Sequence, residues 1–104
     1  MSNNDFVIHY HGFHPNSEVQ THIERCMDFI LSQAPYGSGL EARLVNKNNH
    51  YKGTMAIRSS VGPFFCVSTN TDPKALTDEL VSKMVKNLAR WKAKSFDMSS
   101  QGGT

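Results

Sequence analysis

The sequence has few of the features that mark membrane, secreted or nucleotide-binding proteins. No apolar run approaches the roughly 20 residues that span a bilayer, and the polar, acidic N-terminus does not resemble a secretory signal. The only cysteines, Cys26 and Cys66, match no metal-ligand spacing, which favours reduced thiols in a cytoplasmic protein without a metal or other cofactor. Gly37-Ser38-Gly39 is too short and wrongly placed to open a nucleotide-binding helix. We therefore expect a protein that is not an enzyme and has no small-molecule substrate.

The size of the chain indicates a single folded unit. At 104 residues, of which 38% are hydrophobic and 19% charged, the chain is large enough for one core and too small for two. We expect one domain over residues 1–94. Residues 95–104 form a short polar tail that we expect to be disordered.

Charge is distributed unevenly along the chain, although the formal net charge is only +2. Residues 1–41 hold five acidic side chains against a single arginine. Residues 42–71 hold four basic side chains and no acid, and no acid occurs between Leu80 and Phe96 either. The net charge alone would predict little about partners, whereas this asymmetry predicts a negatively charged one.

Alternating and helical periodicities predict the order of the secondary structure. Residues 6–11 alternate as a half-buried strand, and the helix that follows begins at Asn16 or Ser17 and ends before Pro35. Strands are expected over residues 40–45, 55–58 and 64–69, with polar turns between them. The last and longest helix is expected from Asp72, a good N-cap, to Lys94.

This order, β-α-β-β-β-α, predicts the α+β fold class. Two amphipathic helices cannot bury their apolar stripes alone, so both are expected on one face of a four-stranded mixed sheet, as a two-layer sandwich. The opposite face of the sheet would expose more apolar surface than a solvent face requires, which makes it a candidate contact surface. Its residues would be Val7, His9, His11, Arg43, Arg58, Phe65 and Val67.

The last helix carries the strongest functional signal. Basic residues at spacings of three and four place several positive charges on one helix face, where they can meet phosphates together. We expect anion-binding residues on this helix at Lys83, Lys86, Arg90 and Lys94, with Lys92 beside them. A second basic group stands on or between the second and third strands, at Arg43, Lys47, Lys52 and Arg58. Ordinary solvation of a helix face or a turn is the alternative in both cases.

The strand and helix at the end of the chain resemble those of the short ribosome hibernation-promoting factors and the related ribosome-associated inhibitor. The resemblance is carried by Gly62-Pro63-Phe64-Phe65-Cys66-Val67-Ser68, by Asp72-Pro73-Lys74-Ala75-Leu76-Thr77-Asp78-Glu79-Leu80, and by the basic positions up to Lys94. It covers nearly the whole chain. The first helix departs from the family, since Gln20, Cys26 and Phe29 stand at places that are usually basic there.

The resemblance implies a cytoplasmic, non-enzymatic protein that binds the small ribosomal subunit near the decoding site and the mRNA channel. The basic helix residues would contact rRNA phosphates while the body of the domain blocks the path of tRNA and mRNA. Family members keep idle ribosomes inactive during starvation and stationary phase, so the resemblance implies ribosome hibernation as a stress response. We expect no cofactor, and a monomer away from the ribosome.

Three other hypotheses stay open. The α-β-β-β-α part has the element order of a duplex-RNA-binding module, and the apolar sheet face suits a protein-interaction module. His9, His11 and His14 could supply ligands of a zinc site, although no carboxylate or cysteine stands at ligand spacing nearby. Tyr51 is open for base stacking, whereas Trp91 continues the apolar stripe and is expected at the edge of the core.

Overall fold

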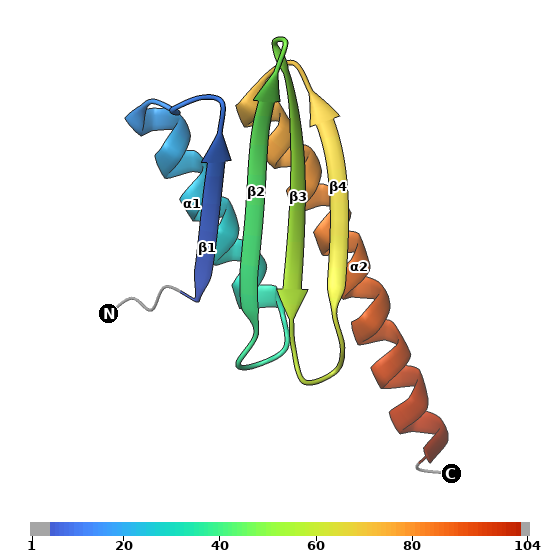
Figure 1. The fold of residues 1–104 in the computed structure, drawn as a ribbon. Helices are drawn as coiled ribbons and strands as arrows, with labels where there is room; N and C mark the ends of the chain where they lie inside the picture. Colours follow the sequence, from blue (N-terminus) through green and yellow to red (C-terminus); the bar gives the residue numbers. More distant parts are fainter. Residues whose placement is uncertain (1–4, 103–104) are drawn as a thin grey trace.

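Four strands form one sheet, and two helices cover one face of it (Figure 1). The computed structural model describes the backbone of residues 5–102 and the side chains of residues 5–94. Residues 1–4 of the predicted domain and residues 103–104 of the predicted tail lie outside the described residues. Its elements are β1 (Phe6–His11), α1 (Ser17–Gln33), β2 (Gly39–Lys47), β3 (His50–Arg58), β4 (Phe64–Asn70) and α2 (Pro73–Gly102). The predicted α+β class and the order β-α-β-β-β-α are confirmed.

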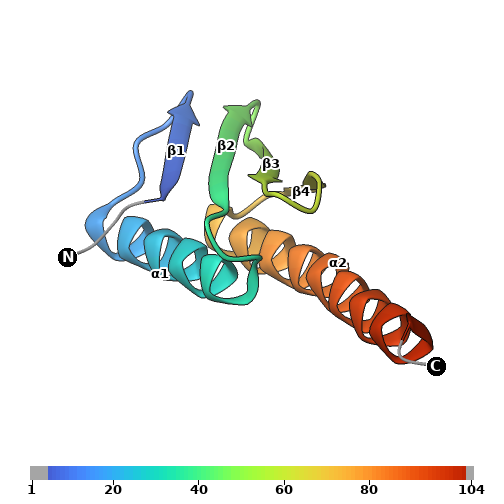
Figure 2. The same cartoon turned by 90° about the horizontal axis from the view of Figure 1, so that it is seen from below.

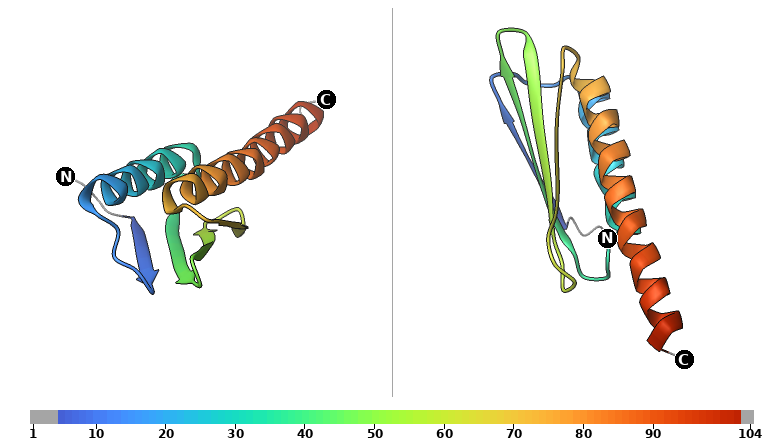
Figure 3. Two further views of the ribbon diagram at one scale, coloured as in Figure 1. Left: turned by 90° about the horizontal axis from the view of Figure 1, so that it is seen from above. Right: turned by 90° about the vertical axis from the view of Figure 1, so that its right-hand side faces the viewer.

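The sheet is mixed, and both helices lie on the same side of it. β1 pairs with β2 in parallel, and β2, β3 and β4 form an antiparallel meander in the spatial order β1-β2-β3-β4. Views from below and from the side show α1 and α2 in one layer and the strands in the other (Figures 2 and 3). The far face of the sheet carries no helix within residues 5–102, because both helices bury their apolar stripes on the near face.

Both helices begin at a side chain that caps the first turn, as the sequence predicts. The Asn16 side chain accepts a hydrogen bond from the backbone N–H of Val19 at 2.9 Å. The Asp72 carboxylate accepts one from the backbone N–H of Ala75 at 2.8 Å. Such caps satisfy N–H groups that have no partner within the helix. Of the two caps considered for the first helix, Asn16 is therefore the correct one.

The β2–β3 hairpin is tighter than the sequence predicts. Asn48 and Asn49 form its two-residue turn with positive φ angles of 55° and 62°, a left-handed conformation that asparagine adopts more readily than most residues. Because the turn takes only two residues, strand pairing continues up to Lys47 and His50. The third strand therefore begins at His50 and not at Met55, where the alternation in the sequence placed it.

The core lies between the sheet and the helix layer. Buried side chains come from the predicted stripes of both helices and from the inward positions of the strands. They are Ile23, Met27, Ile30, Leu40, Ala42, Leu44, Met55, Ile57, Cys66, Leu76, Leu80, Met84 and Leu88. Removal of this apolar surface from water is the main stabilising contribution in so small a domain.

Gly53 in β3 allows α2 to approach the sheet closely. A Cβ atom at this position would lie 2.7 Å from Leu80 Cδ1, 2.9 Å from Leu44 Cδ2 and 3.2 Å from Leu76 Cδ2. Leucines from both layers thus fill the space that a side chain would take. Packing of this density is sensitive to a change of volume on either side.

The last helix is longer than the sequence predicts. It continues to Gly102, whereas the predicted helix ends at Lys94. No glycine or proline occurs between these two residues, so nothing in the backbone ends the helix earlier. The tail expected to be disordered is therefore helical as far as Gly102, while the assignment of residues 1–94 as one domain stays a prediction. Within the described part of the chain, neither helix has the length and apolarity that crossing a membrane requires.

Replacement of Leu80 by alanine is expected to lower the free energy of unfolding by about 2–5 kcal/mol, because it leaves a cavity beside Gly53. Chemical denaturation followed by circular dichroism measures the change. The control is Val61→Ala: the Val61 side chain is 52% exposed, so its truncation should cost no more than about 0.5 kcal/mol. Equal losses in the two variants would contradict the assigned core.

Candidate nucleic-acid interface

The buried stripe of α2 decides where each basic side chain of this helix points. The four residues predicted as the main RNA contacts share one exposed flank: Lys83, Lys86, Arg90 and Lys94. At about 3.6 residues per turn they fall within an arc of roughly 80°, and Lys92 lies roughly 160° from the middle of that arc. Lys92 accordingly faces the first helix, where its Nζ donates to Gln33 Oε1 at 3.2 Å. The structure keeps the four residues together and separates Lys92 from them.

One side of α2 is bonded along the free edge of β4. Lys83 Nζ donates to the carbonyl oxygen of Val67 at 2.8 Å, and Asn87 Nδ2 donates to the carbonyl oxygen of Phe65 at 3.1 Å. Because β4 has a neighbouring strand on one side only, these carbonyls would otherwise be open to water or to another chain. Lys83, predicted to bind RNA, therefore also makes a structural contact.

Glu79 begins this row of contacts one turn before Lys83. Its two carboxylate oxygens accept hydrogen bonds from Ser68 Oγ at 2.6 Å and from Asn70 Nδ2 at 2.8 Å. These hydrogen bonds lower the pKa of Glu79, and the nearby charge of Lys83 lowers it further. Glu79 is the last acidic residue before the part of the helix without acids, which begins at Leu80. Hydrogen bonds from two side chains of β4 already stabilise its negative charge.

Lys86 and Arg90 are the least engaged basic residues on this flank. Both are exposed, and neither makes a side-chain hydrogen bond or ion pair with another side chain among residues 5–94. In the same part of the chain both ion pairs involve a histidine, and no lysine or arginine is paired with a carboxylate. Positive charges that fixed acids do not neutralise raise the local potential and attract anions. This flank can therefore bind phosphates without first breaking internal contacts of these two residues.

The second basic group lies on a different surface, the open face of the sheet. Alternation along the paired strands points these residues away from the helices: Arg43, Lys47, Lys52 and Arg58. Lys47 and Lys52 flank the hairpin turn, whereas Arg58 lies at the other end of β3 and lines an open hollow of about 530 Å³ with Asp5. The edge of β4 separates this face from the basic flank of α2, so the two predicted groups do not form a single flat patch.

The two aromatic residues considered for base stacking are both partly buried. The Trp91 ring packs edge-on against Phe64 with ring centroids 6.1 Å apart, which confirms its expected place at the edge of the core. Tyr51 packs edge-on against Phe13 at 4.9 Å, beside the core. Tyr51 is therefore a packing residue, and it also lines an open hollow beside the hairpin turn.

The zinc site considered as an alternative for the N-terminal histidines does not assemble among the described residues. His9 Nε2 lies 3.0 Å from Glu41 Oε2, and the His9 ring stacks on His11 with centroids 6.5 Å apart. Among the described residues, neither these two histidines nor His14 belongs to a group of three ligand atoms close enough for one ion. Pairing of β1 with β2 brings Glu41, which is far from His9 in the sequence, beside this histidine.

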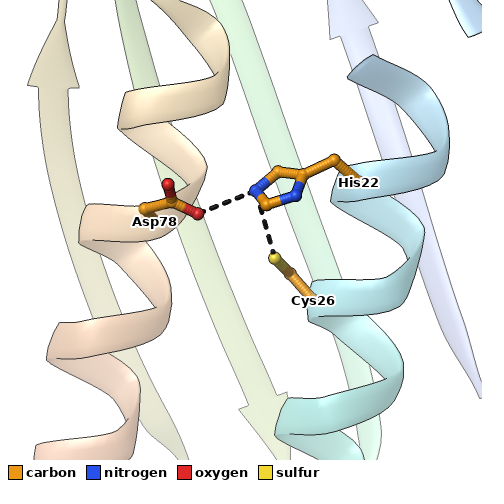
Figure 4. A group of neighbouring side chains, drawn as sticks. All are labelled: His22, Cys26 and Asp78. Carbon is orange, nitrogen blue, oxygen red and sulfur yellow. Dashed lines mark hydrogen bonds and ion pairs between the residues drawn. The ribbon is translucent and has the colours of Figure 1, made fainter. Parts of the chain in front are cut away.

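A different cluster does bring three ligand atoms together, and sequence reasoning missed it. His22 and Cys26 of α1 and Asp78 of α2 each offer one ligand atom, and these atoms lie within 4.8 Å of one another (Figure 4). The statement that neither cysteine has metal-ligand spacing is therefore wrong for Cys26, since a histidine four residues earlier shares its helix face. The spacing of His22 and Cys26 could have been recognised in the sequence, whereas the position of Asp78 beside them depends on how the two helices pack.

Comparisons with known proteins find similarity in the fold alone. No family model matches the chain, and no curated protein sequence does. The solved structure of the Thermus thermophilus Protein Y N-terminal domain is similar with a TM-score of 0.71 at 9% sequence identity, covering 83% of this chain and 97% of that one. A ribosomal subunit interface protein from Coxiella burnetii gives a TM-score of 0.68 at 14% identity, with the same coverage of both chains. The resemblance predicted from the sequence is thereby confirmed at the level of the fold.

Replacement of Glu79 by glutamine is expected to reduce the loss of stability in acid. A carboxylate whose pKa is lower in the folded state contributes stability above its unfolded pKa, and this contribution disappears as the pH falls through the folded value. Between about pH 6 and about pH 3 the thermal midpoint of the wild type should therefore fall further than that of Glu79→Gln. Thermal unfolding at both pH values measures this, with Glu18→Gln on α1 as the control. If Glu79→Gln and wild type fall equally, the bonds from β4 do not hold the carboxylate.

Proposed function

We propose that this chain binds the ribosome and inhibits translation by contacting small-subunit rRNA, as a hibernation factor of the cytoplasm. The observation that carries the proposal is the exposed pair Lys86 and Arg90, which stand one helical turn apart without an acidic partner among residues 5–94. The fold that presents them is shared with a ribosomal subunit interface protein. The proposed role is binding rather than catalysis, with the body of the domain occupying the path of tRNA and mRNA.

Phosphate is the chemical group that this flank suits best. Each phosphate that a lysine or arginine neutralises releases condensed counterions, so the contact is strong at low salt and weakens as salt rises. Lys86 and Arg90 project from consecutive turns of one helix, and the helix is anchored to the sheet by its buried stripe. The backbone positions of the two residues are therefore fixed relative to each other, so only their side chains lose conformational freedom when both meet the RNA backbone.

The arrangement of charge also suggests how the domain faces rRNA. The basic flank of α2 and the basic open face of the sheet lie on either side of the β4 edge, so a surface that touches both wraps around this strand. The first helix lies behind the opposite half of the sheet (Figure 1). It exposes Glu18, Glu24 and Asp28, and it has Gln20 and Phe29 at two of the places where the resemblance to hibernation factors would lead us to expect basic residues. We therefore orient the β4 side toward rRNA and α1 away from it.

Charge reversal at Lys86 and Arg90 tests this interface. The double variant K86E/R90E is expected to bind purified small subunits at least about tenfold more weakly than wild type. The slope of log affinity against log salt should also decrease by about 2, because roughly one unit is lost for each phosphate contact. Co-sedimentation with small subunits over a series of salt concentrations measures both quantities.

The matched control is the double variant R25E/K74E. It changes the formal net charge by the same amount, from +2 to −2, at exposed residues that line a hollow beside α1. If both double variants lose affinity equally, net charge and not the α2 flank governs binding. Absence of wild-type binding at every salt concentration would contradict the ribosome as partner, and equally tight binding to free duplex RNA would favour a general duplex-RNA module.

A second candidate function, protein interaction, is favoured by the open face of the sheet. Phe65 and Val67 expose 59% and 39% of their surface side by side on β4, and Val7 exposes 55% on β1 at the opposite edge of the sheet. Phe65→Ser is expected to leave ribosome binding within about twofold if rRNA phosphates dominate. A loss as large as that of K86E/R90E in the same co-sedimentation assay would instead assign the binding to a protein contact through this face.

A further inference from the structure

The cluster of His22, Cys26 and Asp78 lies between the two helices, apart from both basic groups. His22 and Cys26 stand on consecutive turns of α1 and point toward α2, from which Asp78 points back at them (Figure 4). Asp78 Oδ1 lies 2.7 Å from His22 Nε2, and Cys26 Sγ lies 3.7 Å from the same nitrogen. His22 and Cys26 are partly buried, whereas the Asp78 side chain is 61% exposed.

The geometry argues against a cysteine nucleophile. In a nucleophilic Cys–His–Asp arrangement the histidine bonds the thiol through one ring nitrogen and the carboxylate through the other. Here both partners lie at Nε2, so a nitrogen that donates its proton to Asp78 cannot also accept one from Cys26. Burial raises the pKa of the Cys26 thiol, and the Asp78 charge raises it further, which is the opposite of activation. Three donor atoms converging on one point are instead what a metal ion requires.

We propose that His22 Nε2, Cys26 Sγ and a carboxylate oxygen of Asp78 bind a zinc ion or a similar divalent transition metal between α1 and α2. Zinc prefers nitrogen, sulfur and carboxylate ligands in tetrahedral geometry. From its usual bond lengths, sulfur and nitrogen ligands lie about 3.6 Å apart and nitrogen and oxygen ligands about 3.4 Å apart. The Cys26–His22 distance of 3.7 Å already fits, and the exposed Asp78 carboxylate needs to move by less than about 1 Å.

The charges at the cluster are consistent with a dication. Metal binding exchanges the thiol proton of Cys26 for the metal–sulfur bond, and this proton leaves to the solvent, so affinity falls as the pH falls. The thiolate and the Asp78 carboxylate together balance the charge of a divalent ion. An acidic residue and two basic residues line the open hollow beside His22: Glu18, Arg25 and Lys74. The exposed Asp78 side chain leaves the cluster open to solvent, so water can supply the fourth ligand.

Such an ion would connect the helices at a place where only one side-chain hydrogen bond now joins these residues across the interface. A metal that binds the folded state and not the unfolded chain raises the thermal midpoint with its concentration. The site is therefore a clamp between α1 and α2. It lies away from the proposed rRNA-facing side, and its test on the isolated chain is independent of whether the ribosome is the partner.

Titration of the reduced, metal-free chain, purified without a histidine tag, tests the proposal. Cobalt(II) is the first probe, because thiolate ligation produces a charge-transfer absorption and tetrahedral geometry produces strong visible bands. Zinc competition then gives the zinc affinity. We expect one ion per chain, a thiolate band with cobalt, and a thermal midpoint that rises with zinc concentration.

Two cysteine variants separate the site from non-specific thiol binding. Cys26→Ser should abolish the cobalt thiolate band and weaken zinc binding at least about tenfold, and Asp78→Asn should weaken zinc binding similarly. Cys66→Ser is the matched control, because Cys66 is buried in the core and its thiol donates to the Leu80 carbonyl oxygen. Absence of stoichiometric binding by wild type, or binding that survives Cys26→Ser and is lost in Cys66→Ser, would overturn the proposal.

Discussion

The rotation of α2 about its own axis is the constraint on which most features of this domain depend. Leu76, Leu80, Met84 and Leu88 must all be buried against the sheet, and Gly53 gives the helix room to approach. Once that stripe is fixed, every other position of the helix has a fixed direction. Glu79, Lys83 and Asn87 then face β4, Asp78 and Lys92 face α1, and Lys86 and Arg90 face outward.

Side chains of α2 cover the free edge of the sheet at β4. β4 ends the sheet beside α2, and its outward carbonyls would offer a template for another strand. Side chains spaced four residues apart on α2 cover this edge, so a helix that stabilises the core also blocks edge-to-edge pairing. Lys83 shows that a lysine in a basic stripe can have its main partner within the protein, and a count of basic residues does not reveal this.

The two helices divide the surface by charge. α1 exposes Glu18, Glu24 and Asp28, whereas the charged residues of α2 from Leu80 to Lys94 are all basic. Because α1 packs behind β1 and β2 and α2 behind β3 and β4, this separation along the sequence becomes a separation in space (Figure 1). The proposed contact with phosphate therefore uses the side of the domain away from α1.

Much of the fold could be read from local patterns, because local physics controls them. The caps, the alternation in the strands and the helical stripes depend only on near neighbours; the structure has the Asp72 cap as predicted and, of the two caps considered for the first helix, the one at Asn16. The predicted lengths of the strands and of the last helix were less accurate. The turn at Asn48 and Asn49 is tighter than its polar surroundings suggest, and α2 continues past Lys94 because no residue before Gly102 breaks it.

The sequence by itself determined the α+β class, the order of the elements, the core stripes and the acid-free basic stretch of the last helix. Each of these follows from periodicity or composition, which short segments express on their own. Only the tertiary structure decided that Lys83 is bonded to β4, that Lys92 is turned to α1, and that Asp78 reaches His22 and Cys26. These pairings join residues far apart in the chain, and their geometry exists only after both helices have packed on one face of the sheet.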